Sequence, residues 1–418
     1  MNSSPNPRRF SWLPQLNYQV WILATGHLLS QMGTGFTFFY APIFFVNQVG
    51  LSATAVGIGL GSGSITGVIG RFLGGSFADS QFWGRRRTLL LSAAVSAVAS
   101  FILAFTFNFP IFIVGNLLMG LGVGLYWPAT ESAVADLTTI DQRNEAFAIT
   151  RLADSLGLGM GVVLGGALIG VTGNYRALFV IDAISFIVFF AIVYAAIPET
   201  RKFDQHHTKS ALQGWLVAWR DRHLMIYVVV NILFTIYLSQ VNSTMPLYFT
   251  NFVSGSTSKG GFSPTTISGL FTWHIVFAAL CQLPVIRVLN RFSRPLALTI
   301  SMVLWGVGFI FIGITGVATT GNIIWAVLAL GVLAIATVAY TPSASAFVVD
   351  LAPESMRGIY LSINSQCWAI GYFIGPPLGG WVLDQSVALA HSYWLGIALS
   401  TCLGILILHY LDRILKNR

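Results

Sequence analysis

Charged residues are scarce in this chain: Asp, Glu, Lys and Arg make up 9% of its 418 residues, whereas 55% are hydrophobic. Soluble domains carry about 25% charged residues. A water-soluble fold this poor in charge could not cover its surface, so the composition excludes an ordinary soluble protein. We therefore expect lipid to be the solvent for most of the surface.

Cysteines, metal ligands and enzyme motifs are also lacking. The three cysteines, Cys281, Cys367 and Cys402, fall in apolar stretches and are predicted to be small buried hydrophobic residues. They provide neither a disulfide framework nor a zinc site, and the adjacent His206 and His207 have no further ligands nearby. No phosphate-binding loop, HExxH pair or Gly-x-Ser-x-Gly elbow stands in a suitable context. We expect no metal, no cofactor and no enzymatic activity.

Long apolar stretches make up most of the chain. A stretch of about 20 apolar residues crosses a bilayer as a helix. Twelve such stretches lie at 18–45, 53–78, 88–107, 109–135, 145–171, 177–197, 224–252, 265–288, 295–317, 321–349, 358–383 and 391–412. They are too long for barrel strands and lack the alternation of a barrel. The sequence predicts an all-α membrane protein with twelve transmembrane helices.

The second half of the chain repeats the first at a constant offset of 214 positions. Tyr126, Pro128, Asp136, Leu137, Arg143, Gly157, Gly161, Gly165 and Gly166 recur as Tyr340, Pro342, Asp350, Leu351, Arg357, Gly371, Gly375, Gly379 and Gly380. A constant offset indicates two copies of one architecture. We predict two pseudo-symmetric six-helix bundles, residues 1–197 and 224–418, which rock around a central site. The polar segment 198–223 is the predicted linker, and Trp215, Leu216 and Trp219 favour a short interfacial helix within it.

The net charge of +8 reports topology rather than a polyanionic partner. With the N-terminus inside, arginines and lysines gather in the inner segments, and the outer segments hold only Arg176 and Lys259. This distribution follows the positive-inside rule and predicts that both termini and the linker are cytoplasmic. We expect no nucleic-acid partner.

A motif of glycine, aspartate and arginine follows the second apolar stretch. It comprises Gly75, Asp79, Gly84, Arg85 and Arg86. It resembles the signature of the major facilitator superfamily, with about two extra residues between Asp79 and Gly84. The resemblance implies a latch between the two halves on the cytoplasmic side, for which Asp136 is an expected partner of Arg85 or Arg86. The alternative is that these arginines only hold the loop inside.

A glycine-proline pattern in the eleventh stretch is similar to that of the antiporter branch of this family. It comprises Gly371, Gly375, Pro376 and Gly379. The fifth stretch has the matching glycines Gly157, Gly161 and Gly165, but Val162 where the family has proline. Small residues at intervals of four allow helices to pack tightly.

Few ionisable residues fall inside the predicted spans, and each costs at least ~2.5–3.5 kcal/mol there. Four lie deep in the spans, namely Arg71, Glu131, Arg151 and Asp154, all in the first half, whereas Asp182 lies near the outer start of the sixth span. We expect Glu131 and Asp154 to carry protons and the arginines to tune them, because a carboxyl that exchanges an arginine neighbour for apolar surroundings binds a proton more tightly. The alternative is a permanent structural salt-bridge network.

The substrate chamber is expected between the halves near the midplane. Aromatic and polar residues that we expect to line it are His27, Gln31, Phe36, Tyr126, Trp127, Tyr237, Gln240, Asn242, Trp273, His274, Asn364 and Trp368. Such a chamber suits bulky amphiphilic or weakly cationic solutes.

The resemblance implies a secondary active transporter that exports small amphiphilic or drug-like compounds in exchange for protons. A proton gradient would be the energy source, and the protein would act as a monomer in the bacterial inner (plasma) membrane. The alternatives are a uniporter or proton symporter for a metabolite or lipid, and a sensor or scaffold that transports nothing.

Overall fold

The computed structural model describes residues 16–80, 82–200, 211–253, 261–289, 291–353 and 357–416. Regular secondary structure in these residues is entirely helical, as the sequence predicts. The helices are α1 (Tyr18–Asn47), α2 (Ala53–Asp79), α3 (Gly84–Ala104), α4 (Phe109–Asp136), α5 (Ile140–Thr172), α6 (Arg176–Ala196), α7 (Ala211–Arg220), α8 (Arg222–Ser239), the π-helical turn η1 (Gln240–Thr244), α9 (Met245–Asn251), α10 (Pro264–Leu289), α11 (Arg294–Val317), α12 (Asn322–Leu351), α13 (Arg357–Leu383) and α14 (Val387–Lys416).

Each predicted apolar stretch falls on one of these helices, and the stretch at 224–252 falls on α8, η1 and α9 together. Among the described residues, ten helical segments are long and apolar enough to cross a bilayer. Helices α1 and α13, which are 30 and 27 residues long, are not among the ten. The number of twelve crossings therefore stays a prediction, although the architecture is that of an all-α membrane protein.

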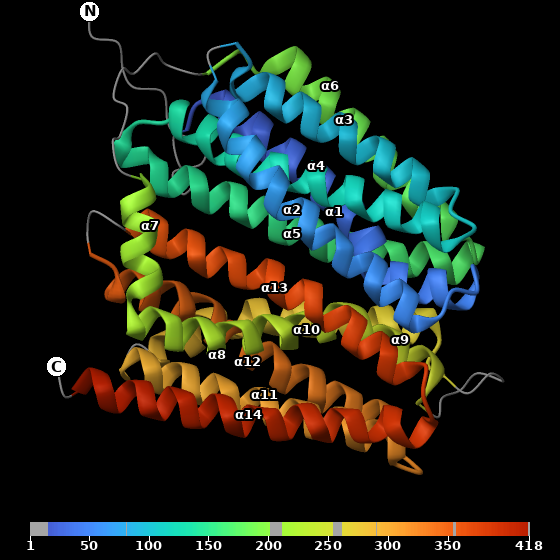
Figure 1. Cartoon of the computed structure of the whole chain (residues 1–418). Coiled ribbons are helices and arrows are strands. Elements are labelled where there is room, and N and C mark those ends of the chain that lie inside the picture. The colour runs from blue at the N-terminus through green and yellow to red at the C-terminus, as the bar shows by residue number, and fades with distance from the viewer. Residues whose placement is uncertain are drawn as a thin grey trace, which may run out of the picture.

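Two groups of helices pack side by side, α1–α6 in one and α8–α14 in the other (Figure 1). In the first group α5 packs on α1, and in the second α13 packs in the same way on α8 and η1. Glycines make both contacts possible: a Cβ on Gly161 would lie 2.2 Å from the Met32 carbonyl oxygen, and one on Gly375 would lie 1.8 Å from Ser239 Oγ. The repeat in the sequence thus corresponds to a repeated helix contact.

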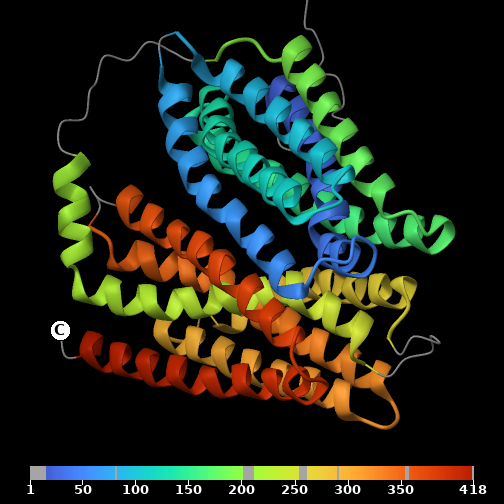
Figure 2. The same cartoon turned by 45° about the vertical axis from the view of Figure 1, so that its right-hand side comes forward.

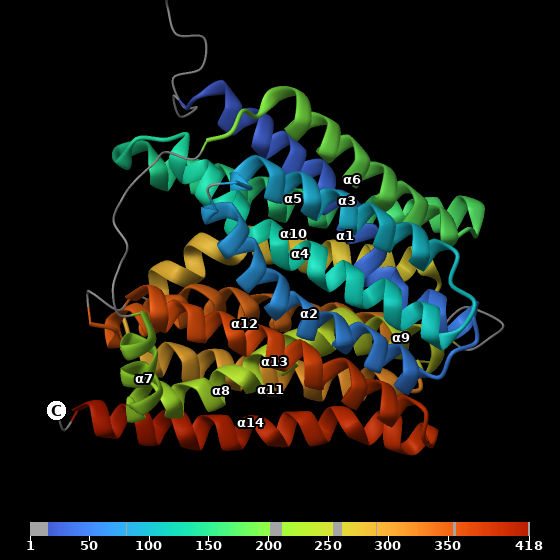
Figure 3. The same cartoon turned by 45° about the horizontal axis from the view of Figure 1, so that its top comes forward.

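The two groups meet at one end and separate at the other (Figure 2). We call the end where α1 begins and α14 ends the terminal face, and the opposite end the distal face. Helices α2 and α13 run side by side at the boundary between the groups (Figure 3). Close to the distal face, Gly57 packs against the backbone of Pro376, and Gly380 against that of Ala53. A second contact joins α5 to α10, where Gly166 lies against Ser268.

Helix α7 lies at the terminal face within the predicted linker, of which residues 201–210 lie outside the described part of the chain (Figure 1). Leu216 and Trp219 of α7 are exposed, which fits an interfacial position; that position stays a prediction. The next helix, α8, is capped at its N-terminus by Asp221, whose carboxylate accepts hydrogen bonds from the backbone of His223 and from the Tyr360 hydroxyl. Burial alone raises the pKa of Asp221, but these hydrogen bonds outweigh it and hold the pKa below its usual value.

Candidate functional site

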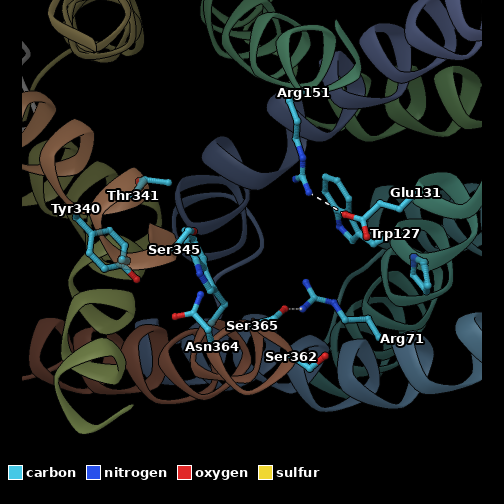
Figure 4. Close-up of a pocket in the computed structure, with 13 residues that line it drawn as sticks. Arg71, Trp127, Glu131, Arg151, Tyr340, Thr341, Ser345, Ser362, Asn364 and Ser365 are labelled. Atoms are coloured by element: carbon cyan, nitrogen blue, oxygen red, sulfur yellow. Dashed lines mark hydrogen bonds and ion pairs between the residues drawn. The ribbon is translucent and has the colours of Figure 1, made fainter. Parts of the chain in front are cut away.

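A cavity of about 800 Å³ lies between the two groups of helices (Figure 4). Its lining residues belong to the parts of their helices that are nearer to the terminal face. It is lined by Arg71 of α2, by Trp127, Pro128 and Glu131 of α4, by Arg151 of α5, by Tyr340, Thr341, Ala344 and Ser345 of α12, and by Ser362, Asn364, Ser365 and Trp368 of α13. Both groups therefore contribute walls, as expected of a site between two moving halves.

The wall made by the first group carries the charges. Arg151 Nη2 lies 2.9 Å from Glu131 Oε1, and the Arg151 guanidinium lies 4.8 Å from the centre of the Trp127 ring. Both charged side chains are half-exposed to the cavity rather than buried in helix contacts. Arg71 Nη1 reaches across to Ser365 Oγ of the second group at 2.6 Å (Figure 4). The three predicted residues Arg71, Glu131 and Arg151 are thus brought together around one space.

The wall made by the second group is polar without charge. Behind it lies a buried hydrogen-bond network in which Tyr340 donates to Asn231 Oδ1 at 2.6 Å. Asn231 Nδ2 in turn donates to Asn364 Oδ1 at 2.9 Å, and the Tyr227 hydroxyl donates to the same oxygen at 3.1 Å. This network fixes the Asn364 side chain with its oxygen turned inward, which leaves its amide N–H groups to the cavity side.

Asp154, the fourth predicted charged residue, does not line the cavity. Its Oδ1 lies 3.0 Å from His27 Nδ1, and the two side chains are 12% and 1% exposed. Tyr126 packs on the His27 ring, with ring centres 5.0 Å apart. Among the described residues, His27 Nε2 and Asp154 Oδ2 are buried and have no hydrogen-bond partner. Such unsatisfied buried atoms are costly, and in native proteins they accompany strain or function.

Of the twelve residues predicted to line the chamber, the cavity contains Trp127, Asn364 and Trp368. Two others, His27 and Tyr126, lie in the buried cluster with Asp154. Gln31 and Phe36 lie at the contact between α1 and α5, beside glycines of α5. These four residues of the first group therefore lie outside the cavity walls.

The remaining five predicted chamber residues turn into the second group. The Tyr237 hydroxyl hydrogen-bonds Ser400 of α14, Gln240 Nε2 donates to the Gly375 carbonyl and Asn242 Nδ2 to the Tyr372 hydroxyl, each at 2.7–2.8 Å. Trp273 Nε1 and His274 Nδ1 bond to backbone carbonyls of α12. The physical reason is the same for all five, because a polar group inside a membrane protein is held by the nearest helix that offers a partner.

The motif at the end of α2 forms a charge cluster near the terminal face. Arg85 bonds Asp79 and also Asp136, with 3.2 Å between Arg85 Nε and Asp136 Oδ2. All three residues belong to α2, α3 and α4, so this cluster joins helices of the first group. Glu199, which was not among the predicted site residues, accepts hydrogen bonds from the backbone N–H groups of Arg85 and Arg86. It caps α3, where a carboxylate is favoured by the helix dipole.

The glycines of this motif have different roles. Gly84 has φ +75°, and a Cβ there would lie 2.2 Å from the Glu199 carboxylate, so this position requires glycine. At Gly75, by contrast, an added Cβ would meet no atom within 4 Å, so this glycine is not required for a close helix contact. The close approach is made one residue earlier, where Gly74 packs on the Leu125 backbone of α4.

The packing glycines lie as the repeat predicts. Gly157, Gly161 and Gly165 of α5 face α1, while Gly371, Gly375 and Gly379 of α13 face α8 and η1. Pro376 instead faces α2 of the other group, where its carbonyl packs on Gly57.

Several residues that line the cavity were not predicted from the sequence. Tyr340 is the repeat partner of Tyr126, and Ser362 and Ser365 flank Asn364 in one polar run, so both signals were present in the sequence. Thr341 and Ser345 follow Tyr340 on α12 and carry no such signal. Within the described ranges, no three His, Cys, Asp or Glu side chains lie close enough together to hold a metal ion.

Comparison with known proteins agrees with this architecture. The sequence profile of the Major Facilitator Superfamily matches residues 23–262 and 256–417. The uncharacterized MFS-type transporter YttB of Bacillus subtilis (strain 168) is 25% identical over 366 residues, which cover 87% of this chain and 88% of YttB. The Na(+), Li(+), K(+)/H(+) antiporter of Planococcus maritimus is 25% identical over 390 residues, covering 84% and 87%. Multidrug resistance protein 2 of B. subtilis (strain 168) is 23% identical over 368 residues, covering 88% and 89%.

Solved structures share the fold at lower identity. The crystal structure of the nucleoside transporter NupG superposes with a TM-score of 0.80 at 15% identity, covering 95% of this chain and 99% of NupG.

Proposed function

The chain belongs to the major facilitator superfamily and is a transporter of the membrane rather than an enzyme; from this premise we propose that it exports small amphiphilic compounds in exchange for protons. The proposal includes a movement in which residues 1–197 and residues 224–418 rock as two units about the linker. The terminal face would be cytoplasmic, since Arg85, Arg86 and Arg222 gather there.

The observation that carries the proposal is the cavity with intramembrane charges in its wall. It lies between the two groups, the groups are in contact near the distal face, and Glu131 and Arg151 face the enclosed space. This arrangement suits a transporter open to its terminal face. Ionisable residues within spans that line a cavity mark pathways for substrates or protons.

Two carboxyls are placed to take part in proton transfer. Glu131 is paired with Arg151 in the cavity, and Asp154 is paired with His27 one turn along α5 from Arg151. A rocking motion that separates Glu131 from Arg151 would raise the affinity of this carboxyl for a proton. Release would follow when the pair re-forms. A gradient of one pH unit supplies ~1.4 kcal/mol, and 100 mV supplies ~2.3 kcal/mol per charge, which is enough for export.

The relatives support the same proposal. An antiporter and a multidrug resistance protein are both similar to this chain over more than four fifths of its length. The cavity walls contain Trp127, Trp368 and Tyr340, which suit aromatic or apolar solutes.

Reconstituted vesicles with an imposed pH gradient test the proposal. We expect that adding a transported compound releases protons across the membrane, and that Glu131→Gln and Asp154→Asn each reduce this flux at least tenfold, because neither side chain can carry a proton afterwards. The matched control Asp412→Asn, in a terminal-face pair with Lys416, should leave the flux unchanged. Substrate flux that is indifferent to pH would contradict proton coupling and favour a uniporter.

A further inference from the structure

The charges that face the cavity do not balance. The described residues that line it include two arginines, Arg71 and Arg151, and one carboxylate, Glu131, which gives this lining a net charge of +1. The second group contributes no charged side chain to the described part of the walls. The nearby Asp154 carboxylate offsets this charge over the whole cluster, but it is paired with His27 and does not line the cavity, so a positive charge still faces the enclosed space.

Arg71 is the cavity arginine that has no ion pair among the described residues. Arg151 has Glu131 at 2.9 Å and the Trp127 ring at 4.8 Å, so its charge is compensated. Arg71 donates to the neutral Ser365 hydroxyl, and Glu131 acts on its charge electrostatically, but no ion pair joins Arg71 to a carboxylate among the described residues. A guanidinium has five N–H donors in a planar fork, so one bond to Ser365 leaves donors for a carboxylate, sulfonate or phosphate.

The opposite wall also offers donors. Asn364 Oδ1 is occupied by Tyr227 and Asn231, which leaves its amide N–H groups on the cavity side. Aromatic side chains on both walls, Trp127 on α4 and Trp368 on α13, can hold an apolar body next to the anionic group. The space of about 800 Å³ is large enough for a drug-sized molecule.

We propose that the cavity binds an amphiphile with an anionic group, and that Arg71 is the residue that pairs with this group. The inference rests on the proposed function in so far as the cavity is the substrate site, and it narrows the substrate class from amphiphiles in general to organic anions. An anionic amphiphile can be a free organic acid or a lipid with an anionic headgroup; the cavity chemistry is the same for both.

Three dansyl probes that differ in charge test the proposal: dansylglycine is anionic, dansylamide is neutral and dansylcadaverine is cationic. Binding to the purified full-length protein in a neutral detergent is followed by dansyl fluorescence. We expect dansylglycine to bind about tenfold more tightly than the other two, because charge-assisted hydrogen bonds to a desolvated guanidinium are among the strong ones. If short-chain phosphatidylglycerol competes with dansylglycine and benzoate does not, the natural ligand is a lipid with an anionic headgroup. If benzoate competes and phosphatidylglycerol does not, the natural ligand is a free organic acid.

Variants assign the effect to Arg71. Arg71→Gln should weaken dansylglycine binding about tenfold and leave dansylamide unchanged, whereas Arg71→Lys should retain most of the affinity. Arg222→Gln, which removes an arginine bonded to Tyr410 at the terminal face, is the matched control and should change nothing. Tighter binding of dansylcadaverine, or an equal loss for all three probes in Arg71→Gln, would overturn the proposal.

These outcomes are separable from those of the vesicle experiment. Arg71-dependent binding of dansylglycine without coupled proton flux would leave the anion site standing and remove antiport. If dansylcadaverine is the only one of the three probes that is exported in exchange for protons, antiport stands and the anion site is removed.

Discussion

His27 and Asp154 are the residues whose chemistry depends most on each other. They form a buried pair between α1 and α5, and each has a second polar atom without a partner among the described residues. Removing one member leaves the other buried and unpaired, which costs more than the pair itself contributes.

The substitution His27→Leu tests this dependence. We expect it to destabilise the protein by about 1–3 kcal/mol, because the Asp154 carboxylate loses its hydrogen bond while it stays buried. The apparent unfolding temperature of the purified protein measures the effect. His409→Leu, at an exposed position of α14, is the control and should be neutral. If Asp154→Asn does not relieve part of the loss in the double variant, the two residues are not coupled.

Some contacts of single residues could be predicted from the sequence, and others could not. The pairing of Glu131 with Arg151 and the contact of Arg85 with Asp136 follow from depth and charge, which the sequence contains. The direction in which Tyr237 and Gln240 point does not follow from the sequence. In a membrane both the packed and the lipid-facing sides of a helix are apolar, so periodicity does not indicate which side faces a cavity.

Among the helices, α5 and α13 combine two tasks. One face of each carries glycines that pack on α1 or α8, and another face contributes Arg151 or Ser365 to the cavity. The glycine spacing could be recognised in the sequence because the close contact requires it at every fourth position. The cap of α3 by Glu199 could not be recognised in the sequence, because Glu199 lies more than a hundred residues from the helix that it caps.

The substitution Gly161→Ala tests the packing of α5. The added Cβ would lie 2.2 Å from the Met32 carbonyl oxygen and 2.9 Å from Gly35 Cα, both backbone atoms that cannot rotate away. We expect a loss of stability of about 1–3 kcal/mol as the helices are forced apart. Gly396→Ala on α14, where a Cβ meets nothing within 4 Å, should be neutral or slightly stabilising. Equal unfolding temperatures for both variants would show that the α1–α5 contact yields easily.

In the whole molecule, polar contacts between the two groups differ at the two faces. Near the distal face, Asp384 at the end of α13 accepts the backbone N–H groups of Ala53 and Thr54 at 2.8 and 2.7 Å, and Asn47 and Asn251 bond to each other. On the terminal side Arg71 and Ser365 make the contact across the cavity. Alternating access requires the distal contacts to break when the terminal side closes.

The substitution Asp384→Ala should therefore shift the protein toward the conformation closed at the terminal face. It removes a carboxylate from the N-terminus of α2, where the helix dipole favours a negative charge, and so destabilises the present conformation by about 1–2 kcal/mol, or roughly five- to thirtyfold in the ratio of conformers. A cysteine introduced by Ser345→Cys in the cavity wall, with Cys281, Cys367 and Cys402 replaced, reports the change. Its reaction with a water-soluble maleimide should slow, by at most that factor, because the rate follows the fraction of molecules that are open at the terminal face. Gln385→Ala, the neighbouring exposed residue, should leave the rate unchanged, and an Asp384→Ala variant that reacts as fast as the parent would show that this contact does not hold the distal face closed.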